Sequence, residues 1–420
     1  MASLAAGGEC LALSSGKHLI SVYIKHDREP FVYDCSKAEQ KPKENEDKGA
    51  DGGSEEKGSD RILAFAFSKS GRLLALTDDN KRLVLFRTEP SWECISTRWV
   101  VRRCTSLAFT QAEDQVLVAD KSGDVYSFSV LEPQRPGDLK LGHLSMLLAL
   151  VVSPDDKYVI TADRDEKIRV SFLRSPHNIQ SFCLGHCEFV SCLFVPPAYP
   201  HWLLSGSGDG TVQLWEYESG RRLQSCNLKE LIVTQPADSD TDKRFAVGRI
   251  ASSPDGRHVA VLCESVPSVQ LFRVEKGTEG QLVPAETLTL PHCAWDLTFD
   301  PQGRLWILQE SRDNPILLYS YTQDCWKCEV EHAELRRAVE VLRTRWDTLQ
   351  DSVGVESRFR HLYKVNFDNM ASYLQKKQER IQQQKQQGGK KRAGQPPQSN
   401  GASKKAKKMG KAEPVAQASS

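Results

Sequence analysis

Cysteine and histidine residues at close spacing are the first candidates for chemistry in this chain. Cys325 and Cys328 form a CxxC pair, which could bind zinc or exchange disulfides, but no second pair follows at zinc-finger spacing. Another group, Cys183, Cys187 and Cys192, surrounds His186, and this histidine belongs to a structural pattern described below. Neither group predicts a metal centre, and we expect no bound metal.

Carboxylate pairs and closely spaced glycines also form no catalytic arrangement. Asp155-Asp156 and Asp78-Asp79 lie in short polar turns, where aspartate is favoured because its side chain accepts backbone hydrogen bonds. The glycines between 206 and 210 do not stand between a strand and a helix, which is the pattern that nucleotide and adenosylmethionine pockets need. No nucleophile, base and orienting group come together. The sequence therefore predicts no catalytic residue and no cofactor on this chain.

One ordered set of polar residues occurs twice, 43–44 residues apart. The more complete copy consists of Gly185-His186, Ser205, Asp209 and Trp215. The preceding copy consists of Gly142-His143, Thr161 and Asp165, with Ser171 where the tryptophan would stand. In such a set the aspartate accepts hydrogen bonds from the histidine and from turn amides, and the hydroxyl links the histidine to the tryptophan. This arrangement satisfies buried polar groups between strands and is typical of a WD-repeat blade.

A short turn that follows an apolar pair recurs along the chain. The spacings between its copies are 42, 43, 43, 57 and 47 residues, close to the period of about 40–45 residues of a WD blade. The longest step contains an insertion, LIVTQPADSDTDKR, that has no strand pattern. An earlier copy fits around Ser15 and brings the number of copies to seven. The markers that define the spacings are Ser68, Thr110, Ser153, Pro196, Ser253 and Asp300.

The runs between these turns predict the fold. Segments such as YVITADRDEKIRVSF combine short apolar or alternating runs with polar turns, which is typical of β-strands. A single blade cannot bury both faces, so radial stacking of blades supplies the core. The sequence predicts an all-β, seven-bladed WD-repeat β-propeller with a C-terminal helical segment and a disordered basic tail. We expect residues 1–36 to form the first blade and the ring-closing strand, and residues 61–322 to form the remaining blades.

Four further segments fall outside the blade pattern. Residues 37–60 contain no large apolar residue and predict a disordered acidic loop. Residues 331–350 have apolar positions at steps of three and four and predict an amphipathic helix, which could pack on the propeller or dock a partner. Residues 366–387 predict a mostly polar helix. Residues 388–420 are rich in Gly, Pro, Ser and Lys and predict a disordered basic tail.

The near-neutral total charge hides a strong asymmetry. From Gln375 to Ser420 the chain carries 12 Lys and Arg against two Glu, a net of +10, and the remainder carries 44 basic and 53 acidic residues, a net of −9. The propeller alone is therefore a poor candidate for a nucleic-acid groove, whereas the tail is a fair one. Its lysine clusters also resemble nuclear-localisation signals, and both roles can hold. We expect a nuclear protein whose candidate RNA-binding residues are Lys376, Lys377, Arg380, Lys390, Lys391 and Arg392.

Membrane insertion and secretion are not expected. The chain has no run of about 18 apolar residues, and no basic segment precedes the apolar residues near its start. Its 12 cysteines are scattered, many of them within strand patterns, so we expect free thiols in a reducing compartment.

Several longer strings are distinctive beyond the general WD pattern. They are LVADKSGDVYSFSVLEP, LGHLSMLL, SPDDKYVITADRDEKIRVS, SFCLGHCEFVS and, near the C-terminus, LYKVNFDNMASYLQKKQER. In these strings the chain closely resembles the WD-repeat, non-catalytic subunit of tRNA guanine-N7 methyltransferase. The resemblance covers nearly the whole chain and is strongest from Ser106 to Trp215. Departures lie near the N-terminus, in the acidic loop and in the far tail.

The resemblance implies a partner and a shared activity. Members of this family bind a separate catalytic subunit that carries adenosylmethionine, and the heterodimer methylates N7 of a guanosine in the variable loop of a subset of tRNAs. The WD-repeat subunit stabilises and orients its partner and helps to position the tRNA. The family motif at the subunit interface matches DEKIR in this chain, which marks Asp165, Glu166, Lys167 and Arg169 as candidate partner-binding residues.

Two other classes of function remain open from the residues alone. An acidic propeller with a basic arm also suits an adaptor in a chromatin or ubiquitin-ligase complex, and some propellers are enzymes. A peptide bound to the propeller would favour the first class, and turnover of a substrate by the isolated chain would favour the second.

Overall fold

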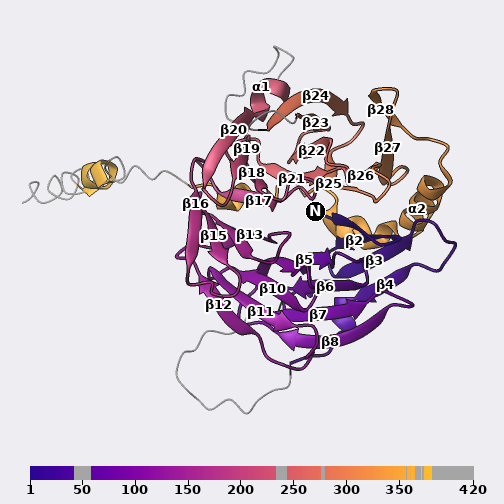
Figure 1. Cartoon of the computed structure of the whole chain (residues 1–420), viewed down its shortest axis with the longest axis horizontal. Coiled ribbons are helices and arrows are strands. Elements are labelled where there is room, and N and C mark those ends of the chain that lie inside the picture. Colours follow the sequence, from indigo (N-terminus) through magenta and orange to yellow (C-terminus); the bar gives the residue numbers. More distant parts are fainter. Residues whose placement is uncertain are drawn as a thin grey trace, which may run out of the picture. The chain divides into compact units, whose positions relative to one another are not determined.

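The computed structural model describes residues 1–41, 58–232, 244–275, 280–355, 357–364, 370 and 373–380. Twenty-eight strands in these residues form seven four-stranded antiparallel sheets, and within each sheet the strands follow one another in sequence order. Figure 1 shows these sheets as blades around a common centre. The predicted seven-bladed β-propeller is confirmed. Residues 1–363 form one compact unit, and the chain beyond is a second unit.

The blades are numbered in chain order. Blades 1 to 3 consist of β1 (Ser3–Gly7), β2 (Cys10–Ser15), β3 (His18–Tyr23), β4 (Phe31–Asp34); β5 (Ile62–Phe67), β6 (Leu73–Asp78), β7 (Arg82–Arg87), β8 (Glu93–Trp99); and β9 (Cys104–Phe109), β10 (Gln115–Asp120), β11 (Asp124–Ser129), β12 (Asp138–Gly142). Blades 4 and 5 consist of β13 (Leu147–Val152), β14 (Tyr158–Asp163), β15 (Ile168–Phe172), β16 (Ile179–Cys183); and β17 (Val190–Phe194), β18 (Trp202–Ser207), β19 (Thr211–Glu216), β20 (Arg221–Asn227). Blades 6 and 7 consist of β21 (Val247–Ser252), β22 (His258–Cys263), β23 (Ser268–Glu275), β24 (Gln281–Thr289); and β25 (Ala294–Phe299), β26 (Leu305–Gln309), β27 (Ile316–Thr322), β28 (Cys325–Cys328).

The recurring turn of the sequence joins the first two strands of a blade. In blade 4, Ser153 Oγ accepts a hydrogen bond from Tyr158 N at 2.9 Å, and Asp155 Oδ1 accepts one from Lys157 N at 3.0 Å. Blade 6 repeats both bonds with Ser253 and Asp255. The S-P-D string recurs because its hydroxyl and carboxylate close this turn locally. In blade 1 the equivalent turn follows Gly7, so the first marker does not lie at Ser15, which ends β2.

Among the described residues, no strand of residues 1–36 joins the last blade, so the predicted ring-closing strand is not found there. All four strands of blade 1 pair with one another, and all four strands of blade 7 come from residues 294–328. The last blade therefore extends beyond residue 322 and includes β28. The two blades meet through their inner strands instead, where Leu4 N donates a hydrogen bond to Asp296 Oδ2 at 2.8 Å.

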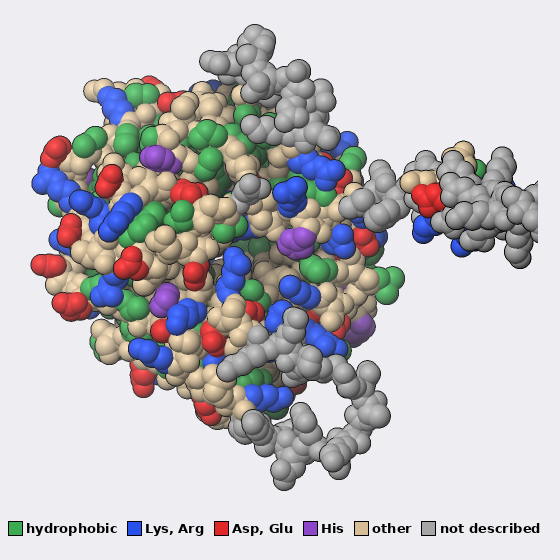
Figure 2. All heavy atoms as spheres, turned by 180° about the vertical axis from the view of Figure 1, so that it is seen from behind, with side chains coloured by type: hydrophobic (Ala, Val, Ile, Leu, Met, Phe, Trp, Pro, Cys, Tyr) green, Lys and Arg blue, Asp and Glu red, His purple; other side chains and the backbone are tan. Residues whose placement is uncertain are grey.

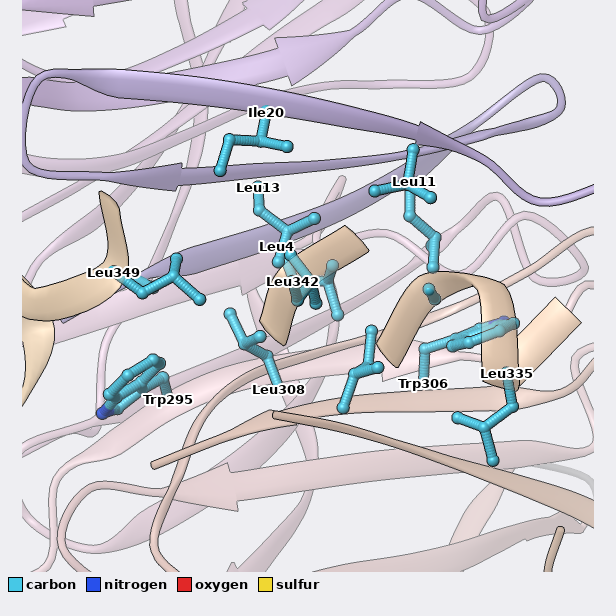
Figure 3. Close-up of a cluster of buried hydrophobic side chains, with 14 of the residues drawn as sticks. Leu4, Leu11, Leu13, Ile20, Trp295, Trp306, Leu308, Leu335, Leu342 and Leu349 are labelled. Atoms are coloured by element: carbon cyan, nitrogen blue, oxygen red, sulfur yellow. The ribbon is translucent and has the colours of Figure 1, made fainter. Parts of the chain in front are cut away.

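A C-terminal helix covers the junction between blades 1 and 7. The helix α2 (Ala333–Thr344) is followed by the 3-10 helix η2 (Trp346–Ser352), so the single helix predicted over residues 331–350 is divided near Arg345. Figure 3 shows Leu342 between Leu4 of the first blade and Leu308 of the last, and Leu335 beside Trp306 of the last blade. The buried cluster at this junction contains Leu4, Leu11, Leu13, Ile20, Trp295, Trp306, Leu308, Leu335, Leu342, Trp346 and Leu349. Of the two roles considered for this segment, packing on the propeller or docking a partner, the structure shows the first.

Shorter helices and the predicted loops complete the described chain. The helices are η1 (Cys35–Lys37), α1 (Leu228–Ile232) and η3 (Arg360–Leu362). Of the predicted acidic loop, residues 42–57 lie outside the described residues, whereas its ends are placed, and Asp60 forms an ion pair with Arg82 at 2.5 Å. Residues 373–380 are helical, within the predicted polar helix, and residues 388–420 lie outside the described residues.

Candidate partner-binding site

Blades 4 and 5 contain the two predicted polar clusters. In blade 5, Trp215 Nε1 donates a hydrogen bond to Ser205 Oγ at 2.8 Å, and His186 Nε2 lies 2.7 Å from the same oxygen. His186 Nδ1 lies 3.0 Å from Asp209 Oδ2. Because Ser205 accepts from the tryptophan, its own proton points to His186 Nε2, and the histidine donates through Nδ1 to the carboxylate. Blade 5 thus contains the complete predicted set.

The aspartate of the blade 4 cluster is Asp163, not Asp165. His143 Nδ1 lies 3.0 Å from Asp163 Oδ2, and His143 Nε2 lies 2.8 Å from Thr161 Oγ1. Asp163 Oδ1 also accepts hydrogen bonds from the backbone amides of Asp165 and Lys167. Asp163 ends β14 in the same way that Asp78 and Asp120 end the second strands of blades 2 and 3. Asp165 is therefore removed from the structural set and remains a surface residue of the turn.

In blade 4 a buried serine, Ser171, stands at the position that tryptophan occupies in the WD set. Ser171 Oγ has no hydrogen-bond partner among the described residues. The bond that joins tryptophan to serine in blade 5 therefore has no counterpart in blade 4.

The blade 5 cluster leads to a prediction about acid stability. Burial alone would raise the pKa of Asp209, but hydrogen bonds from His186, from Cys187 N and from Thr211 lower this pKa to about 2. An unfolded aspartate has a pKa of about 3.9, so its contribution to stability is present above about pH 4 and is lost as the pH falls toward 2. We expect Asp209→Asn to lower the free energy of unfolding at pH 6, and the difference from wild type to narrow by at most about 2 kcal/mol at pH 3.

Urea unfolding of the full chain at both pH values measures this effect. Asp347→Asn, which removes an exposed carboxylate from η2, controls for the general effect of one negative charge. A deficit of Asp209→Asn that is equal at pH 6 and pH 3 would contradict the prediction.

The four residues predicted to bind the partner lie on the turn between β14 and β15 and on β15 itself. Glu166 adopts a left-handed conformation with φ of 64°, and Lys167 is exposed. Ile168 and Val170 are fully buried, whereas Arg169 between them is half-buried and points to the other face of the sheet. This alternation agrees with the expected one. The structure thus groups the four predicted residues around one edge of blade 4.

The positive charge of Arg169 is only weakly neutralised by other groups of this chain. Its Nη1 donates a hydrogen bond to the carbonyl oxygen of Gly142 at 3.0 Å, and its buried Nε has no partner among the described residues. Burial lowers the pKa of Arg169, and the negative charge of Asp163 offsets part of this effect. A planar guanidinium held in this way can form paired hydrogen bonds with a carboxylate from outside.

Two features of this site were missed by the sequence analysis. Gln213 stands in blade 5 where Arg169 stands in blade 4, and its Nε2 donates a hydrogen bond to the carbonyl oxygen of Gly185 at 3.1 Å. The matching positions of Arg169 and Gln213 after Thr161 and Ser205 could have revealed this equivalence. The bond from Arg169 to the Gly142 carbonyl therefore has an equivalent in the next blade, where a neutral glutamine side chain forms it.

The second missed feature is a C-terminal strap, residues 357–363, beside the site. Arg164 Nε donates a hydrogen bond to the carbonyl oxygen of Leu362 at 3.0 Å, and Tyr363 Oη donates one to the carbonyl oxygen of Gly208 at 3.0 Å. Leu362 and Tyr363 are buried against Phe189 and Ala246. The compact propeller unit therefore ends at Tyr363, close to the turn that carries the candidate site.

Basic side chains gather on the face of the propeller that carries this turn. In each blade the turn after the second strand and the connection to the next blade lie at the same end, because successive strands are antiparallel. Figure 2 shows lysine and arginine side chains around the centre of this face. The exposed ones on these turns, connections and strap include Lys37, Lys41, Arg61, Arg102, Lys121, Lys167, Lys229, Arg244, Arg312 and Arg360.

The predicted RNA-binding residues divide into two groups. Lys376, Lys377 and Arg380 lie on the helical residues 373–380 and are exposed. Lys390, Lys391 and Arg392 lie outside the described residues.

The cysteines form no metal site in the part of the chain that the structure describes. No group of three or more His, Cys, Asp or Glu side chains there could hold a metal ion. Cys325 and Cys328 both lie on β28 and are free thiols. Burial raises the pKa of Cys183 to about 12, so this thiol stays protonated and unreactive. Among the same described residues, no helix is both long and apolar enough to span a membrane.

The sheets and their polar clusters define the class of protein. It is a WD-repeat β-propeller. The crystal structure of the RRP9 WD40 repeats resembles it with a TM-score of 0.59 at 20% identity, covering 73% of this chain and 86% of that one. The structure of U3-55K gives a TM-score of 0.58, also at 20% identity, with coverage of 73% and 87%. At this identity the likeness shows the fold alone.

Sequence comparisons identify the family. The model of the tRNA methyltransferase TRM82 WD40 domain matches residues 25–138 and 132–316. A tRNA (guanine-N(7)-)-methyltransferase non-catalytic subunit of Danio rerio is 64% identical over 384 residues, covering 91% of this chain and 92% of that protein. The Homo sapiens subunit of the same description is 49% identical over 375 residues, with 89% of each chain covered. The chain belongs to this family of non-catalytic subunits, and its role is not enzymatic.

Proposed function

We propose that this propeller stabilises and orients the catalytic subunit of tRNA guanine-N7 methyltransferase as a heterodimer. In this heterodimer it helps to position tRNA for N7-methylguanosine formation in the variable loop. Adenosylmethionine binds to the catalytic subunit and not to this chain. The observation that carries the proposal is Arg169, whose guanidinium is half-buried, opposed in this chain by one carbonyl and directed away from the buried side of its strand.

Reconstitution from purified subunits tests this proposal. The chain and its catalytic subunit should co-elute as a one-to-one complex, and the pair should label a guanosine of tRNA from labelled adenosylmethionine. The isolated chain should label nothing above a control without protein. Labelling by the isolated chain, or separate elution of the two subunits, would reject the proposed role.

The basic tail is proposed to contact tRNA phosphates. Removing residues 375–420 deletes a net charge of +10. The affinity of the complex for tRNA should then fall at low salt, and the slope of log affinity against log salt should flatten by about 0.7–0.9 for each lost contact. A slope that is unchanged by the truncation would mean that the tail does not touch RNA.

We also propose that the chain is nuclear and that its tail supports import. Alanine at Lys390, Lys391 and Arg392 should reduce nuclear accumulation, and alanine at Lys376, Lys377 and Arg380 is the charge-matched control. Microscopy of the two tagged triple variants measures this. Equal, fully nuclear distributions of both variants would reject an import role for the cluster at residues 390–392.

A further inference from the structure

Blades 4 and 5 share the polar cluster but differ at the surface around it. The clusters align the two blades. Thr161 contacts the ring of His143 and pairs with Arg169 in blade 4, and Ser205 contacts the ring of His186 and pairs with Gln213 in blade 5. On the following strand, Arg169 of β15 pairs with Phe182 of β16, and Gln213 of β19 pairs with Ser225 of β20. At equivalent positions blade 4 has Leu144, Arg169, Phe182 and Leu184, and blade 5 has Cys187, Gln213, Ser225 and Asn227.

Three large apolar residues of blade 4 lie on or next to the strands and the loop that hold Arg169, and all three are exposed. Leu144 is fully exposed, Leu184 is 62% exposed and Phe182 is 42% exposed. Phe182 shares a sheet face with Arg169 because cross-strand neighbours point to the same side. Leu144 lies two residues beyond Gly142, whose carbonyl binds Arg169, and Leu184 lies two residues beyond Phe182. We call Leu144, Phe182 and Leu184 the apolar collar.

The fold does not require the apolar collar. Blade 5 forms the same cluster and the same ladder with polar residues at two of the three positions and a cysteine at the third. Large apolar side chains that gather around a charged group on a surface are typical of interfaces, because they exclude water from the ion pair at the centre.

We propose that the apolar collar is covered by the catalytic subunit, on a surface whose central carboxylate binds Arg169 and whose surrounding side chains are apolar. The inference rests on the proposed function and adds the chemistry of the contact. The apolar collar adjoins Arg169, on which the proposed contact with the catalytic subunit rests, so we assign it to the same partner. A second copy of this chain could also bring Asp165 or Glu166 to Arg169, and the test below measures this alternative. A partner surface with a carboxylate among apolar side chains would neutralise Arg169 and bury the exposed Leu144 and Leu184.

Binding of full-length variants to the purified catalytic subunit tests the proposal. Leu144→Ser and Phe182→Ser, of which the second introduces the residue that blade 5 carries, should each weaken the complex about tenfold or more. Leu131→Ser is the matched control, because Leu131 is 79% exposed and follows β11 at the opposite end of β12 from Leu144. Isothermal titration should also show a less negative heat-capacity change for the two collar variants, since less apolar surface is buried.

The outcomes separate this inference from the proposed function. If wild type does not bind the catalytic subunit, the proposed function fails and the inference fails with it. If wild type binds but both collar variants bind within twofold of Leu131→Ser, only the inference is overturned. If the chain alone forms a dimer that Phe182→Ser abolishes, the collar binds a second copy, and the inference is likewise overturned. Selective weakening by both collar variants supports it.

Discussion

Replacing Arg169 with leucine is expected to weaken the complex with the catalytic subunit by roughly 30-fold or more. In the proposed interface, the variant removes the guanidinium that binds a carboxylate of the partner, and this guanidinium is held in place by its bond to the Gly142 carbonyl. Once that guanidinium is gone, the partner's carboxylate is desolvated without a counter-charge, which costs about 2–5 kcal/mol. The propeller itself should lose little stability, because the variant breaks one partly exposed hydrogen bond to Gly142 and Ile168 and Val170 keep their buried contacts.

Arg169→Gln separates the two roles of this residue. Gln213 forms the equivalent bond to the preceding glycine carbonyl in blade 5, so glutamine at position 169 can keep the local bond while it removes the charge. We expect Arg169→Gln to match wild type in melting temperature and to bind the catalytic subunit nearly as weakly as Arg169→Leu. Arg169→Lys should recover part of the affinity, because a lysine keeps the charge but not the paired geometry.

Paired measurements of melting temperature and of affinity show whether Arg169 contacts the partner or only stabilises its own blade. Affinity that returns to wild type in Arg169→Gln would show that the bond to Gly142, and not the charge, supports binding. A melting temperature that collapses in Arg169→Leu would make the residue structural. Unchanged affinity in both variants would remove Arg169 from the interface.

Local hydrogen bonds explain why the repeat could be predicted from the sequence. Ser153 and Asp155 close a turn within five residues, and His186, Ser205 and Asp209 recur in a fixed order because the blade ladder fixes their distance. In blade 4 two aspartates stand near the position of the cluster aspartate, and the prediction from spacing selected Asp165 instead of Asp163. Blade 4 has Asp163 and Asp165 in its turn, whereas blade 5 has Ser207 at the first of these positions, so Asp209 has no competitor.

Long-range features could not be predicted in the same way. Whether the last blade takes a strand from the N-terminus depends on pairing between residues about 300 positions apart, and the sequence of β1 suits either arrangement. The strap is also invisible in periodicity, because Leu362 and Tyr363 are buried by contacts with blades 4 to 6 and not by a regular pattern of their own. The family resemblance located the candidate site. Its second role in the blade, which the matching positions after Thr161 and Ser205 could have indicated, emerged from the comparison of blades 4 and 5.

Because blades 1 and 7 share no strand in the described part of the chain, the C-terminal helix α2 adds an apolar link between them. Leu342 on α2 is fully buried in the cluster that joins Leu4 and Leu11 of blade 1 to Leu308 of blade 7 (Figure 3). A polar contact fixes α2 to blade 7, because Arg304 of this blade forms ion pairs with Asp300 of the same blade and with Glu334 of α2. The helix thus contributes to closing the ring as well as covering it.

Leu342→Ala should lower the free energy of unfolding by about 2–5 kcal/mol, because it leaves a cavity at this junction. Alanine is the stronger helix former, so any gain in helix propensity opposes this loss and cannot account for it. Arg343→Ala is the matched control, since Arg343 is the next residue of α2 and is exposed, and we expect it to change stability by less than about 0.5 kcal/mol. Urea unfolding of the full chain, followed by tryptophan fluorescence, measures both variants, and Trp295, Trp306 and Trp346 report directly from the junction. If the two variants are equally stable, the helix lies on the propeller without holding it closed, and the contacts between the inner strands β1 and β25, among them the bond from Leu4 to Asp296, close the ring without it.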